Sequence, residues 1–275
     1  MKLRAFCASV VSSYKEFRII RILLLLFIPV LLFAGESGWN TRWTSHFLIH
    51  QENSRSAKGV GAEMEKIFRG LRKELWSLSS WMDTEKVEVY LYKDRKSYLE
   101  GRFKPPEWSG GMVYKSGRRG AQWSLAVYEP FSPKTVAHEL THLYFASFFK
   151  RVPGRLPLWL NEGLAVMMVE ETAGRVKPSY RGPPVDKAIP AEVFLKLKKI
   201  PNSDSGSVQD FYSQAHSVVR FLKKGNSPFK FEKFCRQLRD GEQVERALFS
   251  AYGFGSMEKF EKAWKKWAAP PGPGK

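Results

Sequence analysis

The chain has 275 residues, of which 43% are hydrophobic and 14% aromatic, so it can bury a substantial core. That composition excludes an intrinsically disordered protein, and the length indicates one functional unit, in one lobe or in two lobes around a cleft. The formal net charge is +18; five basic residues and one acidic residue lie in residues 1–34, so +14 remains on the rest. This charge suits an anionic membrane surface or acidic polymer as partner, or simply a soluble basic surface, and no nucleic-acid-binding motif is visible.

Residues 1–34 have the pattern of an export signal. Thirteen apolar residues, Ile22–Ala34, follow a basic leader; this is the size of a signal-peptide core and short for a membrane span. Ala34-Gly35 offers a small-residue cleavage point. The alternative is an uncleaved membrane anchor over residues 17–34, with the N-terminus inside. In either case we expect the rest of the chain to lie outside the cytoplasm, in the periplasm or secreted.

A linker rich in Gly, Ser and Trp is expected over residues 35–43, and a region of strands and helices follows it. The expected elements are a strand over 44–50, a long helix over 56–80, a strand over 86–92, a short helix over 95–101, and paired strands over 109–114 and 122–129 joined by a charged turn at 115–120.

The chain after Ser132 is predicted to be helical, apart from one loop and the tail. Helices are expected over 133–149, 157–171, 190–199, 208–223, 228–240, 242–252 and 256–268. The Pro/Gly-rich stretch 174–184 predicts a loop or flap near a cleft, and residues 269–275 predict a disordered tail. Strands followed by helices predict an α+β fold: a small mixed-sheet lobe, two central helices and an all-helical C-terminal lobe, in one domain over residues 44–268.

The pattern His138-Glu139-Leu140-Thr141-His142, with Glu162 twenty positions further on, has the ligand spacing of a catalytic zinc site. Residues four apart on a helix share a face, so two imidazoles can bind one ion. A carboxylate on a second helix can supply the third ligand, which leaves one position open for water. Zinc lowers the pKa of that water to about 7, and Glu139 can take its proton as general base. Ser132-Pro133, an N-cap followed by Pro, opens this helix where the motif requires.

The remaining His and Cys residues offer no competing metal site. His46 and His50 lie on one face of the strand over 44–50 but too far apart to share an ion, so we expect them to be exposed or hydrogen-bonded. Cys7 belongs to the leader, which leaves Cys235 as the only cysteine of the rest. No internal disulfide can then form, and zinc cannot be held by thiolates.

Two stretches, Thr-Val-Ala-His138-Glu139-Leu-Thr-His142 and Leu-Trp-Leu-Asn161-Glu162-Gly163-Leu-Ala, resemble the gluzincin metallopeptidases. These include thermolysin, the aminopeptidase-N-like enzymes and especially the peptidase MA-like domain family. That family's third signature, a helix opening with Tyr, is similar to Tyr212–Leu222, and its terminal helix-turn-helix with a Trp is similar to Phe254–Trp267. The resemblance covers most of residues 44–268. It implies that His138, His142 and Glu162 bind one zinc and that Glu139 is the general base.

The resemblance also assigns residues around the metal. Tyr212 falls where aminopeptidase-N-like enzymes place a tyrosine whose hydroxyl donates to the oxyanion; the alternative is an aromatic side chain packed in the core. His216, one turn along, either faces the same cleft or is a buried polar residue. Gly110-Gly111-Met112 lies where those relatives have an edge strand that pairs with an extended peptide, so these three residues are expected to bind the substrate.

Two positions depart from the family pattern. Val113 stands where the aminopeptidases carry a Glu that binds the free amine of the substrate, so this chain is expected to be an endopeptidase or an unusual exopeptidase. Val166 stands where thermolysin carries an Asp that supports a zinc-bound His, so that support must come from another residue or from backbone carbonyls.

The sequence therefore predicts a zinc-dependent peptidase of gluzincin type that acts on peptide or protein substrates outside the cytoplasm. Two other hypotheses belong to different classes. One is a non-catalytic binding or scaffold protein of the cell envelope that keeps the fold; loss of Glu139 or of a ligand would favour it, and all four residues are present. The other is a protein whose function is its charge-driven binding to a membrane surface or polyanion, which would be strongly sensitive to salt.

Overall fold

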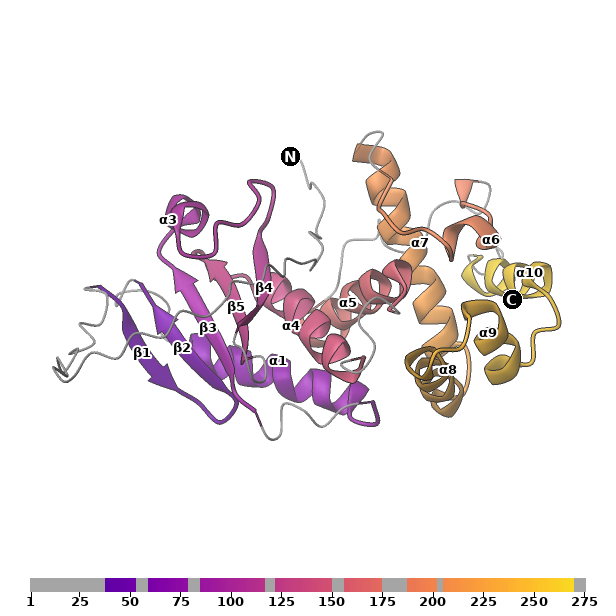
Figure 1. Ribbon diagram of the computed structural model, residues 1–275, viewed down its shortest axis with the longest axis horizontal. Helices are drawn as coiled ribbons and strands as arrows, with labels where there is room; N and C mark the ends of the chain where they lie inside the picture. The colour runs from indigo at the N-terminus through magenta and orange to yellow at the C-terminus, as the bar shows by residue number, and fades with distance from the viewer. Residues whose placement is uncertain are drawn as a thin grey trace, which may run out of the picture.

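The computed structural model describes residues 38–52, 59–78, 85–116, 122–149, 156–174, 187–201 and 205–269. Figure 1 shows a sheet at one end of the molecule, α7 to α10 at the other end, and α4 and α5 between them. This arrangement confirms the predicted α+β fold, with a small mixed sheet followed by a mostly helical C-terminal region. The predicted leader (1–34), most of the loop at 174–184 and the tail beyond Ala269 lie outside the described residues.

The sheet has five strands in the order β1-β2-β3-β5-β4. Strands β2, β3 and β5 run parallel to one another, while β1 and β4 are antiparallel edge strands. Their bounds are β1 Asn40–Trp43, β2 Phe47–Gln51, β3 Val87–Tyr92, β4 Gly111–Ser116 and β5 Gln122–Tyr128. The four strands β2 to β5 confirm the predicted ones, and β4 continues two residues into the expected turn.

Strand β1 corrects the prediction of a linker over residues 35–43. All four of its residues are exposed, so the segment has no buried side-chain face that would mark it as a strand in the sequence. It is held through its backbone pairing with β2, in which Asn40 faces Gln51 and Trp43 faces Leu48. Strand β2 begins only four residues after Trp43, but a segment with no buried face lacks the alternation of apolar and polar side chains that predicts a strand.

Helix α1 (Val60–Leu75) packs its apolar face into the main core, as the sequence predicts for the helix over 56–80. Figure 1 shows it running beneath the sheet. The short helix α3 (Arg95–Glu100) begins at Asp94, whose side chain accepts a hydrogen bond from the Ser97 backbone amide. Its Tyr98 belongs to a second, smaller cluster on β3 and β5, which also contains Tyr90 and Tyr92. The two clusters show that both faces of the sheet are covered in the described residues.

The C-terminal region is helical, as predicted. Its helices are α6 Ala191–Phe194, α7 Ser205–Lys224, α8 Pro228–Asp240, α9 Val244–Tyr252 and α10 Met257–Ala268. Helix α6 is shorter than the predicted helix over 190–199. The buried apolar side chains end at Leu195, three lysines lie among the next four residues, and Pro201 disfavours helical backbone at the residue before it. Within the part of the chain described, no helix is long and apolar enough to cross a membrane.

Helices α5 (Leu158–Ala173) and α7 cross in direct backbone contact at Gly163. A Cβ atom built on Gly163 would lie 2.3 Å from the carbonyl oxygen of Ala215 and 2.7 Å from a methyl group of Val219. Only a residue without a side chain fits this approach, since contacts below 3.0 Å force the neighbour to move. The contact joins the two halves of the molecule immediately beside Glu162.

Candidate metal centre

Helix α4 (Pro133–Phe148) carries the His-Glu-x-x-His pattern, and its start is set by the sequence. The Ser132 side chain accepts a hydrogen bond from the Thr135 backbone amide (3.2 Å), and Pro133 occupies the first turn. This is the predicted N-cap with proline, which fixes the helical phase from the first turn onward. His138 and His142 consequently lie one turn apart on the same face.

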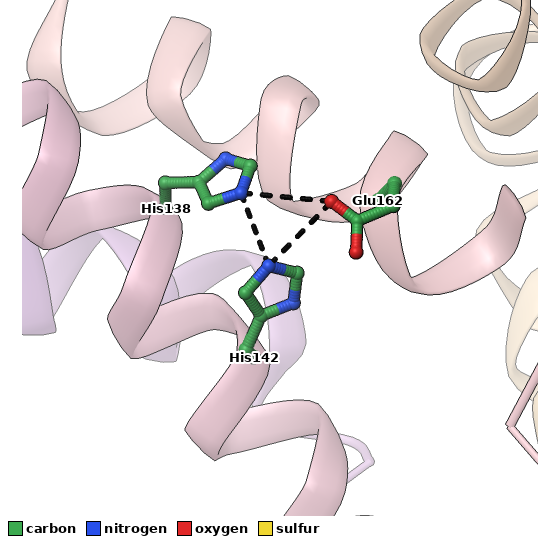
Figure 2. Close-up of side chains that lie close together, drawn as sticks. All are labelled: His138, His142 and Glu162. Carbon is green, nitrogen blue, oxygen red and sulfur yellow. Dashed lines mark hydrogen bonds and ion pairs between the residues drawn. The ribbon is translucent and has the colours of Figure 1, made fainter. Parts of the chain in front are cut away.

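Glu162 enters from α5 and meets the two histidines. Figure 2 shows both imidazole rings and the carboxylate directed toward one another from two helices. The His138 and His142 Nε2 atoms are 3.0 Å apart, and each lies 3.7 Å from the Glu162 Oε2 atom. One ligand atom from each of the three residues lies within 4.8 Å of the others, so they form a potential metal site.

The three side chains fit a zinc ion in both spacing and chemistry. Ligand atoms about 2.05 Å from a tetrahedral zinc lie roughly 3.3 Å apart, which falls between the 3.0 and 3.7 Å separations in this site. Two imidazole nitrogens and one carboxylate oxygen are a donor set that zinc accepts, whereas calcium and magnesium prefer all-oxygen sites. Cys235, the only cysteine in the described residues, lies buried in α8 and outside this cluster.

Burial sets the protonation of the centre. Glu162 is fully buried, and His138 and Glu139 are 7% and 6% exposed. Burial, reinforced by the nearby His142, holds the pKa of the His138 imidazole well below its ordinary value, which favours the neutral form that binds metal. Burial, reinforced by the Glu162 carboxylate, raises the pKa of Glu139 well above its ordinary value. A carboxyl group shifted upward in this way is suited to accepting and returning a proton.

Glu139 lies beside the edge strand β4. A Cβ built on Gly111 would be 3.3 Å from the Glu139 Cγ atom and 2.7 Å from a methyl carbon of Thr135, so the strand passes close to α4. Gly111 and Met112 are the first two residues of β4, and Gly110 lies in the bend before it. The structure thus places the predicted substrate-binding segment at the edge of the sheet and next to the predicted base. Val113, on the same face of β4 as Gly111, packs against the main core.

Tyr212 lies on α7, one turn before Ala215, which contacts Gly163. Residues three apart on a helix share a face, so Tyr212 lies on the side of α7 that meets α5. Helix α5 is the one that carries Glu162. The side chain is 7% exposed and belongs to the main core, and its ring packs edge-on against Phe211. Its position is compatible with both roles that the sequence leaves open.

The other histidines lie outside the cluster. His46 Nδ1 is 2.8 Å from a Glu65 carboxylate oxygen, and His50 Nε2 is 3.1 Å from a Glu88 carboxylate oxygen. Both are hydrogen-bonded, as expected. His216 is 3% exposed, and its Nε2 atom lies 3.2 Å from a Glu170 carboxylate oxygen. This contact makes His216 a buried, paired residue between α5 and α7.

A family model described as the peptidase MA superfamily matches residues 74–269, more than half of the chain. The chain belongs to the peptidase MA superfamily. The match includes α4, α5 and α7, and therefore the two histidines, both glutamates and Tyr212. A search of curated proteins gave no significant relative. Membership makes this protein a peptidase in general terms, with a peptide or protein as substrate, and peptidases of this superfamily typically depend on a metal.

Two residues that position the centre of this peptidase were not found from the sequence. Gly163 allows α5 and α7 to touch, and a glycine inside a helix is a signal that could have pointed to such a contact. Ser109 is 3% exposed; its hydroxyl donates to the Gly111 carbonyl oxygen (2.6 Å) and shares a 2.8 Å hydrogen bond with the Tyr98 hydroxyl. These bonds fix the start of β4 beside Glu139, and nothing in the local sequence marks them.

Proposed function

We propose that this protein is a zinc-dependent endopeptidase of gluzincin type. The observation that carries the proposal is the convergence of His138, His142 and Glu162 from two helices at zinc-ligand spacing, with Glu139 on the same helix turn but outside the ligand set. A protein that retained the fold only for binding would have no need of Glu139 at this place. The arrangement therefore favours hydrolysis over a non-catalytic scaffold in the cell envelope.

Each residue has a distinct task in the proposed reaction. Zinc, when bound by the three ligands, polarises the scissile carbonyl and lowers the pKa of water. The Glu139 carboxylate accepts a proton from the attacking water and delivers it to the nitrogen of the leaving amine. The Tyr212 hydroxyl donates a hydrogen bond to the substrate carbonyl oxygen as negative charge develops there. The exposed edge of β4 holds an extended peptide through main-chain hydrogen bonds, which places the scissile bond next to Glu139.

Endopeptidase specificity rests on Val113, whose apolar side chain packs against the core near α4. An ammonium group in a buried cleft needs a carboxylate partner, because an unpaired buried charge costs several kcal/mol. We therefore expect that acetylating the N-terminus of a peptide substrate leaves kcat/KM roughly unchanged. Matched acetylated and free peptides from a cleaved library test this. Loss of cleavage on acetylation would instead show an aminopeptidase whose amine site lies elsewhere.

The proposed role of Tyr212 predicts a loss in turnover. Tyr212→Phe removes the hydroxyl while keeping the ring in the core, so we expect kcat to fall by about 10²–10³-fold with little change in KM. Tyr252→Phe is the matched control, because it removes another buried hydroxyl of the helical region, one that donates to the Leu222 carbonyl oxygen. If both variants keep wild-type kcat, Tyr212 is a packing residue only.

We also propose that the peptidase acts outside the cytoplasm, on the pattern of residues 1–34. The apolar run Ile22–Ala34 behind a basic leader supports export, with cleavage after it or with retention of residues 17–34 as an anchor. A topology reporter fused after Lys275 should be active only on the outer side of the membrane. A cytoplasmic signal would contradict this localisation and leave the proposed chemistry unaffected.

A further inference from the structure

Within residues 38–269, the net positive charge per residue is higher in the helical region after Gly174 than in the part before it. Residues 175–269 contain nineteen Lys and Arg against ten Asp and Glu, a net charge of +9 over 95 residues. Residues 38–174, which hold the sheet and the metal centre, contain twenty Lys and Arg against fifteen Asp and Glu, a net charge of +5 over 137 residues. Both parts are basic, and the higher charge density of the helical region gives it the stronger attraction for anionic surfaces.

Three large apolar side chains are exposed near one corner of this region. Trp76 follows the last residue of α1 and is 70% exposed; Phe229, in the first turn of α8, is 80% exposed; and Trp267, in the last turn of α10, is 39% exposed. Single exposed aromatic residues are ordinary on protein surfaces, whereas a group of them marks an interaction site. We refer to Trp76, Phe229 and Trp267 as the aromatic corner.

Contacts among four helix ends bring these residues together. The Arg236 guanidinium of α8 donates to the Ser77 carbonyl oxygen (2.6 Å), and Lys223 Nζ of α7 lies 2.6 Å from a Glu74 carboxylate oxygen of α1. These bonds hold the end of α1, with Trp76, against α7 and α8.

Trp267 joins the same corner from α10. A Cβ built on Gly225, in the turn between α7 and α8, would lie 2.9 Å from the Trp267 Nε1 atom, and the Trp267 and Phe221 ring centroids are 5.8 Å apart. Phe229 lies four residues after Gly225, in the first turn of α8. The ends of α1 and α10, which carry Trp76 and Trp267, therefore both meet the segment of α7 and α8 that carries Phe229.

Basic residues frame the aromatic corner. The last turns of three helices that meet there are basic: Arg72 and Lys73 in α1, Lys223 and Lys224 in α7, and Lys265 and Lys266 in α10. Glutamates offset part of this charge: Lys223 and Lys224 pair with Glu74, Lys224 also pairs with Glu171, and Lys265 pairs with Glu261. Tryptophan together with Lys and Arg is the combination that lies stably at the boundary between lipid headgroups and acyl chains.

We propose that the aromatic corner docks the protein on the surface of an anionic lipid bilayer. The indole and phenyl rings enter the headgroup region, and the surrounding Lys and Arg side chains contact lipid phosphates. A soluble acidic polymer would account for the charge but not for three exposed aromatic rings beside it. The proposal does not depend on the peptidase activity, and it does not depend on residues 1–34 acting as an anchor.

Tryptophan fluorescence of the full-length chain with brominated lipids tests the proposal. Residues 1–34 contain no Trp, so quenching by bromine on the acyl chains reports on the rest of the chain even if the leader is inserted. In vesicles of phosphatidylglycerol and brominated phosphatidylcholine, we expect quenching of the wild-type emission. The double variant Trp76→Phe/Trp267→Phe should lose most of this quenching. Trp43→Phe is the matched control, because Trp43 is 67% exposed on β1, at the opposite end of the molecule in Figure 1.

The salt concentration separates the contribution of charge. Raising the salt concentration from 0.1 to 1 M shortens the screening length from about 10 to about 3 Å. Quenching of the wild type in anionic vesicles should therefore fall at high salt. In neutral vesicles, quenching should be weak at either salt concentration. Quenching that persists in the double variant, that disappears in Trp43→Phe, or that is equally strong in neutral vesicles would overturn the proposal. Binding to a soluble polyanion without any lipid-dependent quenching would also overturn it.

Discussion

Replacing Glu139 with Gln is expected to lower kcat for peptide cleavage by about 10²–10⁴-fold while metal binding stays near the wild-type level. Gln has nearly the same shape as Glu but has no carboxylate to accept the proton of the attacking water. Glu139 does not belong to the cluster formed by the two histidines and Glu162, so the ligand set remains intact. Kinetics on one peptide and metal content by mass spectrometry, on the same preparation, measure both quantities.

Stability provides a control for the Glu139 variant. Burial and the Glu162 carboxylate both raise the pKa of Glu139, so the native fold opposes its ionisation. A neutral Gln at this position should therefore leave the thermal midpoint equal to that of the wild type or higher. Cleavage by Glu139→Gln at the wild-type rate would rule out Glu139 as the general base.

Replacing Glu162 with Ala is expected to weaken zinc binding by more than about 100-fold, since loss of even an outer-shell partner of a metal ligand costs 10–100-fold. The Glu162 side chain is fully buried, and its Oε2 atom lies 3.7 Å from both histidine Nε2 atoms, so no exposed residue can easily replace it. Competition with a chelator of known affinity measures the change, and cleavage should be lost in parallel.

A second glutamate on the same helix provides the matched control. Glu171 of α5 is ion-paired with Lys224 (3.3 Å) and lies outside the metal cluster. Glu171→Ala should therefore keep both the zinc affinity and the cleavage rate of the wild type. Equal zinc affinity in Glu162→Ala and Glu171→Ala would remove Glu162 from the ligand set.

The metal centre could be predicted from the sequence because its information is local. The spacing of His138 and His142 is fixed by helical geometry, and Ser132-Pro133 fixes where the helix begins. The prediction that Glu162 is the third ligand needed one further assumption, which is that its helix packs against α4. The chain satisfies it through a strongly apolar α5, which is buried on most sides.

Most of the features that were not predicted depend on contacts between distant segments. Strand β1 is an exception, because it pairs with β2, which follows it directly in the chain; it was missed because it is exposed along its whole length. The approach of Gly111 to Glu139, and the hydrogen bond from Ser109 that holds Gly111, depend on how β4 meets α4. The aromatic corner likewise joins residues from Trp76 to Trp267, far apart in the sequence. Such proximity follows from tertiary packing, which periodicity and capping signals do not encode.

Chelation and reconstitution of the wild-type chain test the central claim most directly. The claim is that His138, His142 and Glu162 hold one zinc ion that peptide hydrolysis requires. The purified chain should contain about one zinc, given three protein ligands around one ion. Removal of the metal by a chelator should abolish cleavage of a peptide library, and one equivalent of zinc should restore it. Cleavage at an undiminished rate by a preparation shown to be free of metal would contradict the account.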